Sequence, residues 1–274
     1  MEGIQVMEGS QITEGLEENK TMLWWRILSG FATFNIILWV ILLFTVDSSK
    51  PYIWWQLIFS GIFTFVCAFR SYFPRICLER YCLFDSFFSS IVLGRSLATI
   101  AEVSFAFQVA LLVHEMGAAT GILWVQNLFF PIILLLTIAQ VFCWASVFTL
   151  NHLGHAIEES IWAFTFALVG VSMAFCLHRL DGLWYNVVLS GTVACSLYVL
   201  FMVIVDIPMY VKRLKKGKLK GDHSMDLWNG LKDALTRRVA TRDWKIWKPE
   251  VAWLSGYFTF GVWVSLLMVY LERT

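Results

Sequence analysis

The chain has 274 residues, of which 58% are hydrophobic and 15% are charged, and its formal net charge at pH 7 is +1. An ordinary soluble domain has about a quarter charged residues and less than half apolar ones. The composition therefore excludes a soluble globular protein and predicts one embedded in a bilayer. The near-neutral charge gives no basis for nucleic-acid binding, so we expect membrane lipids as partners and no nucleic acid.

The N-terminal segment is polar and acidic over residues 1–22. It lacks the basic and apolar regions of a secretory signal peptide. We expect residues 1–22 to form a short disordered tail, followed by a single transmembrane domain over residues 23–274. The first span would then act as an uncleaved insertion signal.

Seven apolar segments are long enough to cross a bilayer as helices, which takes about 20 residues. Runs of this length exclude the strands of a membrane barrel, which need about ten residues. The sequence therefore predicts an all-α bundle of seven transmembrane helices, or six if the second segment is re-entrant. The segments cover residues 23–46, 52–73, 86–114, 119–150, 157–178, 184–211 and 250–271.

Basic residues gather in connections that seven spans would place on the side of the N-terminus. The segment from Lys212 to Gly221 reads KRLKKGKLKG, and Arg70, Arg75 and Arg80 surround the second connection. Basic loops stay in the cytosol, so we expect the N-terminus inside and the C-terminus outside. Both the endoplasmic reticulum and the plasma membrane are compatible with this orientation.

The connection over residues 212–249 predicts a short amphipathic helix before the last span. Leu227, Leu231, Leu235 and Val239 recur every four residues, with charged residues between them. This pattern is typical of a helix that lies on a membrane surface. We expect it on the cytosolic leaflet, where it would anchor the chain or recognise lipid headgroups.

Cysteine spacing predicts neither a zinc site nor a disulfide framework, because the six cysteines form no CxxC or Cys–His pattern. We therefore expect no metal ligands among them, and the sequence leaves any cofactor unknown. Four cysteines fall in apolar segments and are expected to pack as small hydrophobic side chains: Cys67, Cys143, Cys176 and Cys195.

The third span carries two charged residues, which are costly in a membrane and usually face the bundle interior. Arg95 and Glu102 are seven residues apart, within about 20° of one helix face, and Thr99 lies between them. Two helical turns separate them by about 10 Å along the axis, so the spacing does not assure an ion pair. We expect each to meet neighbouring helices, either in a structural network or in a site where Arg95 binds an anion.

The fourth span places Thr137, Gln140, Trp144 and Asn151 on one stripe. Such a stripe predicts hydrogen bonds between helices. The polar side chains could equally bind the polar part of a substrate.

The sixth span ends with Asp206 close to the basic residues that follow it. Pro208 removes a backbone hydrogen bond nearby and favours a kink. We expect Asp206 either to pair with Arg213 or Arg70 or to line a site.

The segment NHLGHAIEESIW, residues 151–162, concentrates titratable groups between two apolar spans. His152, His155 and Glu159 share one face if the segment is helical. Glu158 and Glu159 would stand in the first turn of the fifth span, where a helix N-terminus favours negative charge. Capping is one explanation, and proton transfer by buried His and Glu side chains is the other.

The polar groups of these spans lie toward the predicted cytosolic half, which predicts a polar cavity open to the cytosol or inner leaflet. We expect an intramembrane enzyme that performs acid–base chemistry, such as isomerisation, cyclisation or hydrolysis, on a small lipophilic substrate of the lipid or isoprenoid class. The catalytic candidates are Glu159, Glu158, His155 and Glu102. The substrate-binding candidates are Arg95, Thr99, Gln140, Trp144, Asn151, His152 and Asp206.

Two alternatives are also compatible with the sequence. A proton-coupled transporter or channel could use the same groups, although no inverted repeat of the kind common in transporters is visible. The second alternative is an enzyme assisted by a metal ion, which His152, His155, a glutamate and Asp206 would hold. The five histidines are too few for a histidine-box oxygenase.

Overall fold

The computed structural model describes residues 2–220 and 224–271. It is helical apart from three two-residue strands, and it contains seven segments long and apolar enough to cross a membrane. The predicted bundle of seven transmembrane helices is confirmed, and the protein is a multi-pass membrane protein. The spans are Glu17–Thr45, Pro51–Tyr72, Ile91–Thr120, Leu123–Thr149, His152–Arg179, Gly182–Gly217 and Trp244–Tyr270.

The first three spans are single helices: α1 (Glu2–Thr45), α2 (Pro51–Tyr72) and α3 (Ile91–Thr120). The fourth joins α4 (Leu123–Gln126) to α5 (Phe129–Thr149), and the fifth joins α6 (His152–Cys176) to the 3-10 turn η2 (Leu177–Arg179). The sixth joins α7 (Gly182–Phe201), the π-helical turn η3 (Met202–Asp206) and α8 (Ile207–Lys220). After α9 (Leu227–Thr236), the seventh joins α10 (Trp244–Gly256), the π-helical turn η4 (Tyr257–Gly261) and α11 (Val262–Tyr270).

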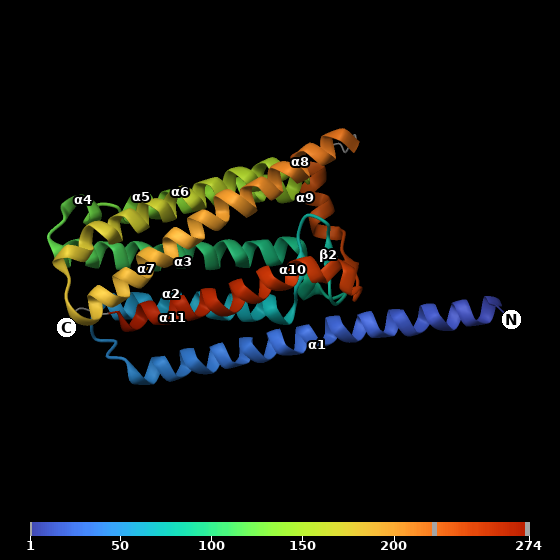
Figure 1. The fold of residues 1–274 in the computed structure, drawn as a ribbon, viewed down its shortest axis with the longest axis horizontal. Helices are drawn as coiled ribbons and strands as arrows, with labels where there is room; N and C mark the ends of the chain where they lie inside the picture. The colour runs from blue at the N-terminus through green and yellow to red at the C-terminus, as the bar shows by residue number, and fades with distance from the viewer. Residues whose placement is uncertain (1, 221–223, 272–274) are drawn as a thin grey trace.

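Helix α1 begins at Glu2, so the segment expected as a disordered tail is helical in the structure. Extending an existing helix requires no new nucleus, which allows the apolar span to propagate into the polar residues before it. The helix projects beyond the other spans at the N-terminal end (Figure 1).

Helix α3 lies between two groups of helices in the bundle (Figure 1). One apolar core forms around α1, α2 and the seventh span, and another around α3, α5 and α6. Small side chains let α3 pack closely on both sides, because Ala98, Ala101, Ala106 and Ala110 are all at most 1% exposed. Large apolar side chains cover the outside of the spans, where lipid chains would contact them; Phe44 and Phe130 are 81% and 77% exposed.

The N-terminus and the connections 73–90, 150–151 and 224–243 lie at one end of the bundle, which we call the basic end (Figure 1). A small sheet joins two of these connections. Strand β2 (Tyr81–Cys82) pairs antiparallel with β1 (Arg75–Ile76) and parallel with β3 (Val239–Ala240). The sequence did not predict this sheet, because strands of two residues carry no alternation.

Two buried arginines hold the basic end together. Arg80 is fully buried, and its Nε donates to Asp233 Oδ2 of α9 at 2.9 Å, while Nη2 donates to the Val147 carbonyl of α5 at 2.9 Å. Arg75 donates to backbone carbonyls, including that of Phe88. Burial lowers the pKa of Arg75 to about 10, so it still carries its charge at neutral pH.

Helix α9 is the expected amphipathic helix, but it packs through its small residues. Gly230 and Ala234 are buried, and Gly230 lies against the Phe148 carbonyl, where a Cβ would collide. Leu227 and Leu235 point away from the bundle and are 58% and 53% exposed. The predicted helix was too long, because Val239 belongs to β3; residues 221–223 of this connection lie outside the described residues.

Candidate functional site

A buried ion pair lies on the face that α3 turns toward α5. Arg95 Nη2 contacts Glu102 Oε2 at 2.9 Å, and the two residues are 7% and 8% exposed. The spacing in the sequence did not assure this contact. It forms because both residues share one helix face and the long arginine side chain reaches along two turns.

Helix α5 completes this ion pair with hydrogen bonds. Gln140 Nε2 donates to Glu102 Oε2 at 2.6 Å, and Gln140 Oε1 accepts from both Arg95 Nη2 and Thr99 Oγ1. Trp144 Nε1 donates to Thr99 Oγ1 at 3.0 Å. These five residues, which we call the Arg95 network, were all candidates from the sequence, and two helices bring them together.

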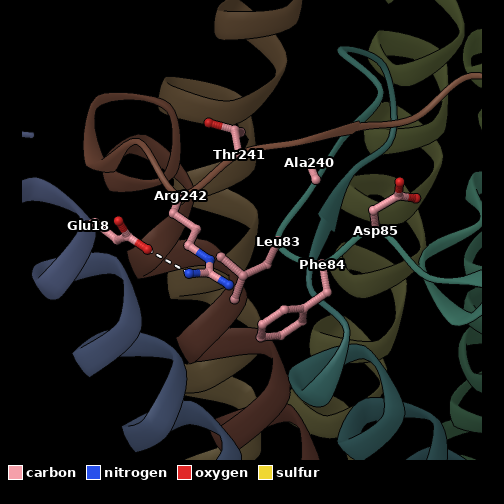
Figure 2. A pocket seen from close by; sticks show the side chains of 7 residues that line it. All are labelled: Glu18, Leu83, Phe84, Asp85, Ala240, Thr241 and Arg242. Atoms are coloured by element: carbon pink, nitrogen blue, oxygen red, sulfur yellow. Dashed lines mark hydrogen bonds and ion pairs between the residues drawn. The ribbon is translucent and has the colours of Figure 1, made fainter. Parts of the chain in front are cut away.

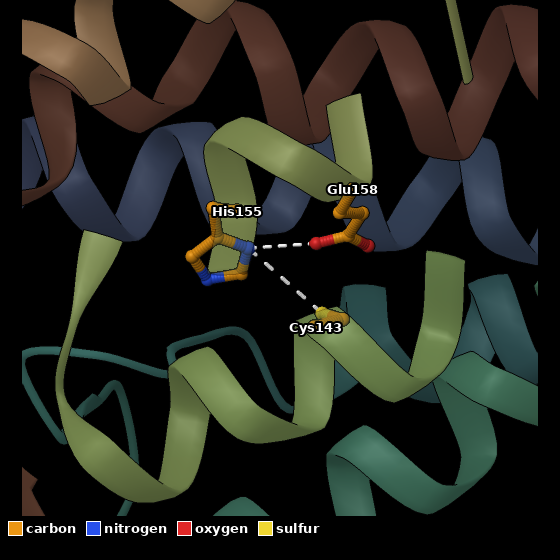
Figure 3. A group of neighbouring side chains, drawn as sticks. All are labelled: Cys143, His155 and Glu158. Atoms are coloured by element: carbon orange, nitrogen blue, oxygen red, sulfur yellow. Dashed lines mark hydrogen bonds and ion pairs between the residues drawn. The ribbon is translucent and has the colours of Figure 1, made fainter. Parts of the chain in front are cut away.

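A second polar group lies between α5 and α6. His155 Nδ1 lies 2.7 Å from Glu158 Oε2 on α6, and Cys143 Sγ of α5 lies 3.9 Å from the same nitrogen (Figure 3). Glu158 is 4% exposed. We call Cys143, His155 and Glu158 the His155 cluster. The charge of Arg95 interacts with Cys143 and Glu158, so the cluster and the Arg95 network are neighbours.

The start of α6 positions His155. Asn151 is the N-cap residue, and its Oδ1 accepts from Leu153 N at 3.0 Å. Ser146 Oγ donates to the Asn151 carbonyl and accepts from His155 N at 3.2 Å. The structure thus gives Asn151, a substrate-binding candidate in the sequence, a capping contact.

The two glutamates lie deeper than the sequence suggested. We expected Glu158 and Glu159 in the first turn of the fifth span, but α6 begins at His152 and no acidic residue stands in its first turn. Capping therefore does not explain them. The side chain of Glu159 forms no hydrogen bond with a described residue, and its charge interacts most strongly with those of Glu158 and Asp206.

Helix α8 covers the start of α6. The ring of Tyr210 lies 5.1 Å from that of His155 and 6.1 Å from that of His152, centroid to centroid. The Arg213 guanidinium lies over the Tyr210 ring, 5.8 Å from the ring centroid. Tyr210 therefore closes one side of the His155 cluster, a role for which the sequence gave no signal.

Asp206 is buried in the π-helical turn η3 and is 6% exposed. The ion pair expected with Arg213 or Arg70 does not form among the described residues. Arg213 stacks on Tyr210, and Arg70 lies over the Phe258 ring at 5.0 Å. π-Helical turns in helices frequently occur at functional sites, and this one turns Asp206 inward.

Three buried polar atoms of this region have no hydrogen-bond partner among the described residues: Arg95 Nε, His152 Nδ1 and Asp206 Oδ2. Most buried polar atoms are paired with protein or ordered water. The three atoms come from α3, α6 and η3, around the two polar groups. These three atoms remain available for a polar ligand.

The His155 cluster also has donors that suit a metal ion. Cys143 Sγ, His155 Nδ1 and a Glu158 carboxylate oxygen all lie within 4.8 Å of one another, and zinc accepts this combination of ligands. Nitrogen and oxygen ligands of a tetrahedral zinc are about 3.3 Å apart. The 2.7 Å contact between His155 and Glu158 is that of a hydrogen bond, so the side chains would have to separate to hold an ion.

The sequence assigned Cys143 to hydrophobic packing, and the structure places it in the polar cluster. The available signal was its position three residues after Gln140, which is close to the polar stripe of the fourth span. A cysteine in an apolar run does not reveal its neighbours on another helix, and this explains the omission.

Two surface grooves lie elsewhere in the molecule, and neither is lined by the Arg95 network or the His155 cluster. The first, of about 460 Å³, lies at the basic end, where Arg242 Nη1 contacts Glu18 Oε1 at 2.6 Å (Figure 2). Its other lining residues are Leu83, Phe84, Asp85, Ala240 and Thr241. The second lies along α8. The open polar cavity expected from the sequence is neither of these grooves.

Comparisons with known proteins do not identify the chain. No protein-family model, curated protein or solved structure matches it significantly.

We expect Glu102→Leu to lower the thermal unfolding midpoint of the detergent-solubilised protein strongly. Removing one partner of a buried ion pair costs about 3–5 kcal/mol, because the other charge stays buried. The double variant Arg95→Met/Glu102→Leu removes both charges and should recover most of that loss. Tryptophan fluorescence during heating measures both.

Glu115→Leu is the matched control, because Glu115 is a half-buried glutamate of α3 that forms no ion pair with a described residue. It should change the midpoint little. A loss in the double variant equal to the sum of the losses in Glu102→Leu and Arg95→Met would show that Arg95 and Glu102 do not interact.

Proposed function

We propose that the protein is an intramembrane enzyme in which His155 and Glu158 act as an acid–base pair. The observation that carries this proposal is their partly buried 2.7 Å hydrogen bond on α6. A carboxylate bound to one imidazole nitrogen orients the ring and stabilises its protonated form. With Nδ1 bound to Glu158, Nε2 is the nitrogen that exchanges a proton with the substrate.

The Arg95 network would bind the polar part of the substrate. Arg95 Nη2 is occupied by Glu102 and Gln140, whereas Arg95 Nε has no partner among the described residues. Nε and Nη1, which form no hydrogen bond with a described residue, are the donors that would stabilise developing negative charge. In this proposal Glu102 positions Arg95, and Glu159 and Asp206 extend the acidic side of the site.

The substrate would be a lipophilic molecule, such as a lipid or an isoprenoid, because the site lies within membrane spans. Isomerisation, cyclisation and hydrolysis each need a proton donor and acceptor at adjacent positions. The pair on α6 could supply both.

One observation favours a second candidate function, proton-coupled transport. Glu158, Glu159 and Asp206 form a group of interacting carboxylates on two helices, and intramembrane carboxylates are typical of proton pathways. In that case protonation of the group would accompany substrate movement without chemical change.

Wild type, Glu158→Gln and Glu159→Gln should be reconstituted into liposomes made from a total lipid extract, with Glu115→Gln as control. We expect wild type and the control to convert at least one lipid, as detected by mass spectrometry. Glu158→Gln should reduce conversion by about 100-fold or more, because loss of a general acid–base group costs at least this much.

The same liposomes distinguish the two candidates. A transporter would be supported, and the enzyme contradicted, by the following result. Wild type dissipates an imposed pH gradient without converting any lipid, and Glu159→Gln no longer dissipates the gradient. Unchanged lipids and an unchanged gradient with wild type would refute both.

We propose that the basic end faces the cytosol, in the endoplasmic reticulum or the plasma membrane. The support is the distribution of charge, because positively charged connections are retained in the cytosol. Glycosylation acceptor sequences should be appended through flexible linkers to either terminus of the protein. We expect a glycan only on the C-terminal tag, and a glycan only on the N-terminal tag would reverse the orientation.

A further inference from the structure

A groove of about 390 Å³ runs along the outer face of the sixth span. Its lining residues repeat at helical spacing, so they form one stripe that begins in η3 and continues through α8. They are Ile204, Val205, Pro208, Met209, Lys212, Arg213 and Lys216.

The groove has an apolar half and a basic half. Ile204 and Val205 are 62% and 50% exposed and lie within the span, where lipid chains would surround them. Lys212 and Lys216 follow two and three turns later, close to the end of the span at Gly217. The change from apolar to cationic therefore matches the change from acyl chain to headgroup along a phospholipid.

The two lysines of the cationic half have no acidic partner in the described part of the chain, whereas the charge of Arg213 interacts with Asp206 and Glu250. Lys212, Arg213 and Lys216 form no ion pair with a described residue, whereas Arg80, Arg95, Arg238 and Arg242 each do. Arg213 also contacts the Tyr210 ring. Lys212 and Lys216, one helical turn apart at a membrane boundary, attract an anion of complementary charge.

We propose that this groove binds an anionic phospholipid, with an acyl chain on Ile204 and Met209 and the phosphate between Lys212 and Lys216. A free phosphate ion would not use the apolar half, so the geometry favours the lipid. The π-helical turn η3 has one more residue per turn than an α-helix. It therefore rotates the residues before Pro208 relative to the face of α8 that follows. This proposal does not depend on the proposed enzymatic function.

Purified protein should be incubated with equal amounts of phosphatidylglycerol and phosphatidylcholine and examined by native mass spectrometry. We expect selective retention of phosphatidylglycerol by wild type. Each lysine near an anionic headgroup contributes about a fivefold change in affinity, so Lys212→Gln/Lys216→Gln should lose about 25-fold. Inorganic phosphate at millimolar concentration should not displace the lipid.

Lys215→Gln/Lys232→Gln is the matched control, because it removes the same charge from exposed lysines that do not line the groove. It should retain the lipid. Met209→Trp fills the apolar half without changing charge, and it should also lose the lipid. Equal retention of phosphatidylcholine, an equal loss in the control, or displacement by phosphate would each overturn the proposal.

Discussion

An ion pair within a membrane bundle must be neutralised by its own surroundings, because neither lipid nor water supplies a counter-charge there. Arg95 and Glu102 satisfy this constraint by contacting each other on α3, and Gln140 of α5 bonds to both. Any rotation of α3 or α5 would break several of these contacts at once. The relative orientation of the two central helices therefore depends on this network.

The position of the His155 cluster follows from the orientation of α5. Cys143 lies one turn beyond Gln140, and Ser146 lies one turn further, where it contacts both Asn151 and His155 N. Through these contacts across the short connection, the polar face of α5 lies against the polar side chains at the start of α6. Tyr210 of α8 then packs on His155, so a chain of contacts links α3, α5, α6 and α8.

The fold could be predicted largely from the sequence, because span length and apolar composition are local properties. The members of the Arg95 network could be named for the same reason, because Arg95, Thr99 and Glu102 share one helix face and Gln140 and Trp144 share one stripe. The ion pair and its contact with α5 were not predicted. Which faces meet could not be predicted. Periodicity places Cys143 on a helix face, but it does not reveal that His155 lies opposite.

Other differences between the predicted and the observed structure also arise from contacts between segments that are distant in the sequence or from helix capping. The register of α6 depends on the Asn151 cap, and this places Glu158 and Glu159 beyond the first turn. The face that α9 buries depends on the Arg80–Asp233 ion pair and on Gly230, which are contacts between segments distant in sequence. The leucine spacing indicated a helix here but extended it too far, to Val239 of β3, and it gave no information about this docking.

The most direct test of the central claim is an experimental structure of the protein in lipid nanodiscs, determined by electron microscopy at side-chain resolution. We expect density for the Arg95 side chain in contact with Glu102 and Gln140, and density that joins His155 to Glu158 beside Cys143. Arg95 or Glu102 directed toward lipid, or the two polar groups separated by packed apolar side chains, would contradict this claim.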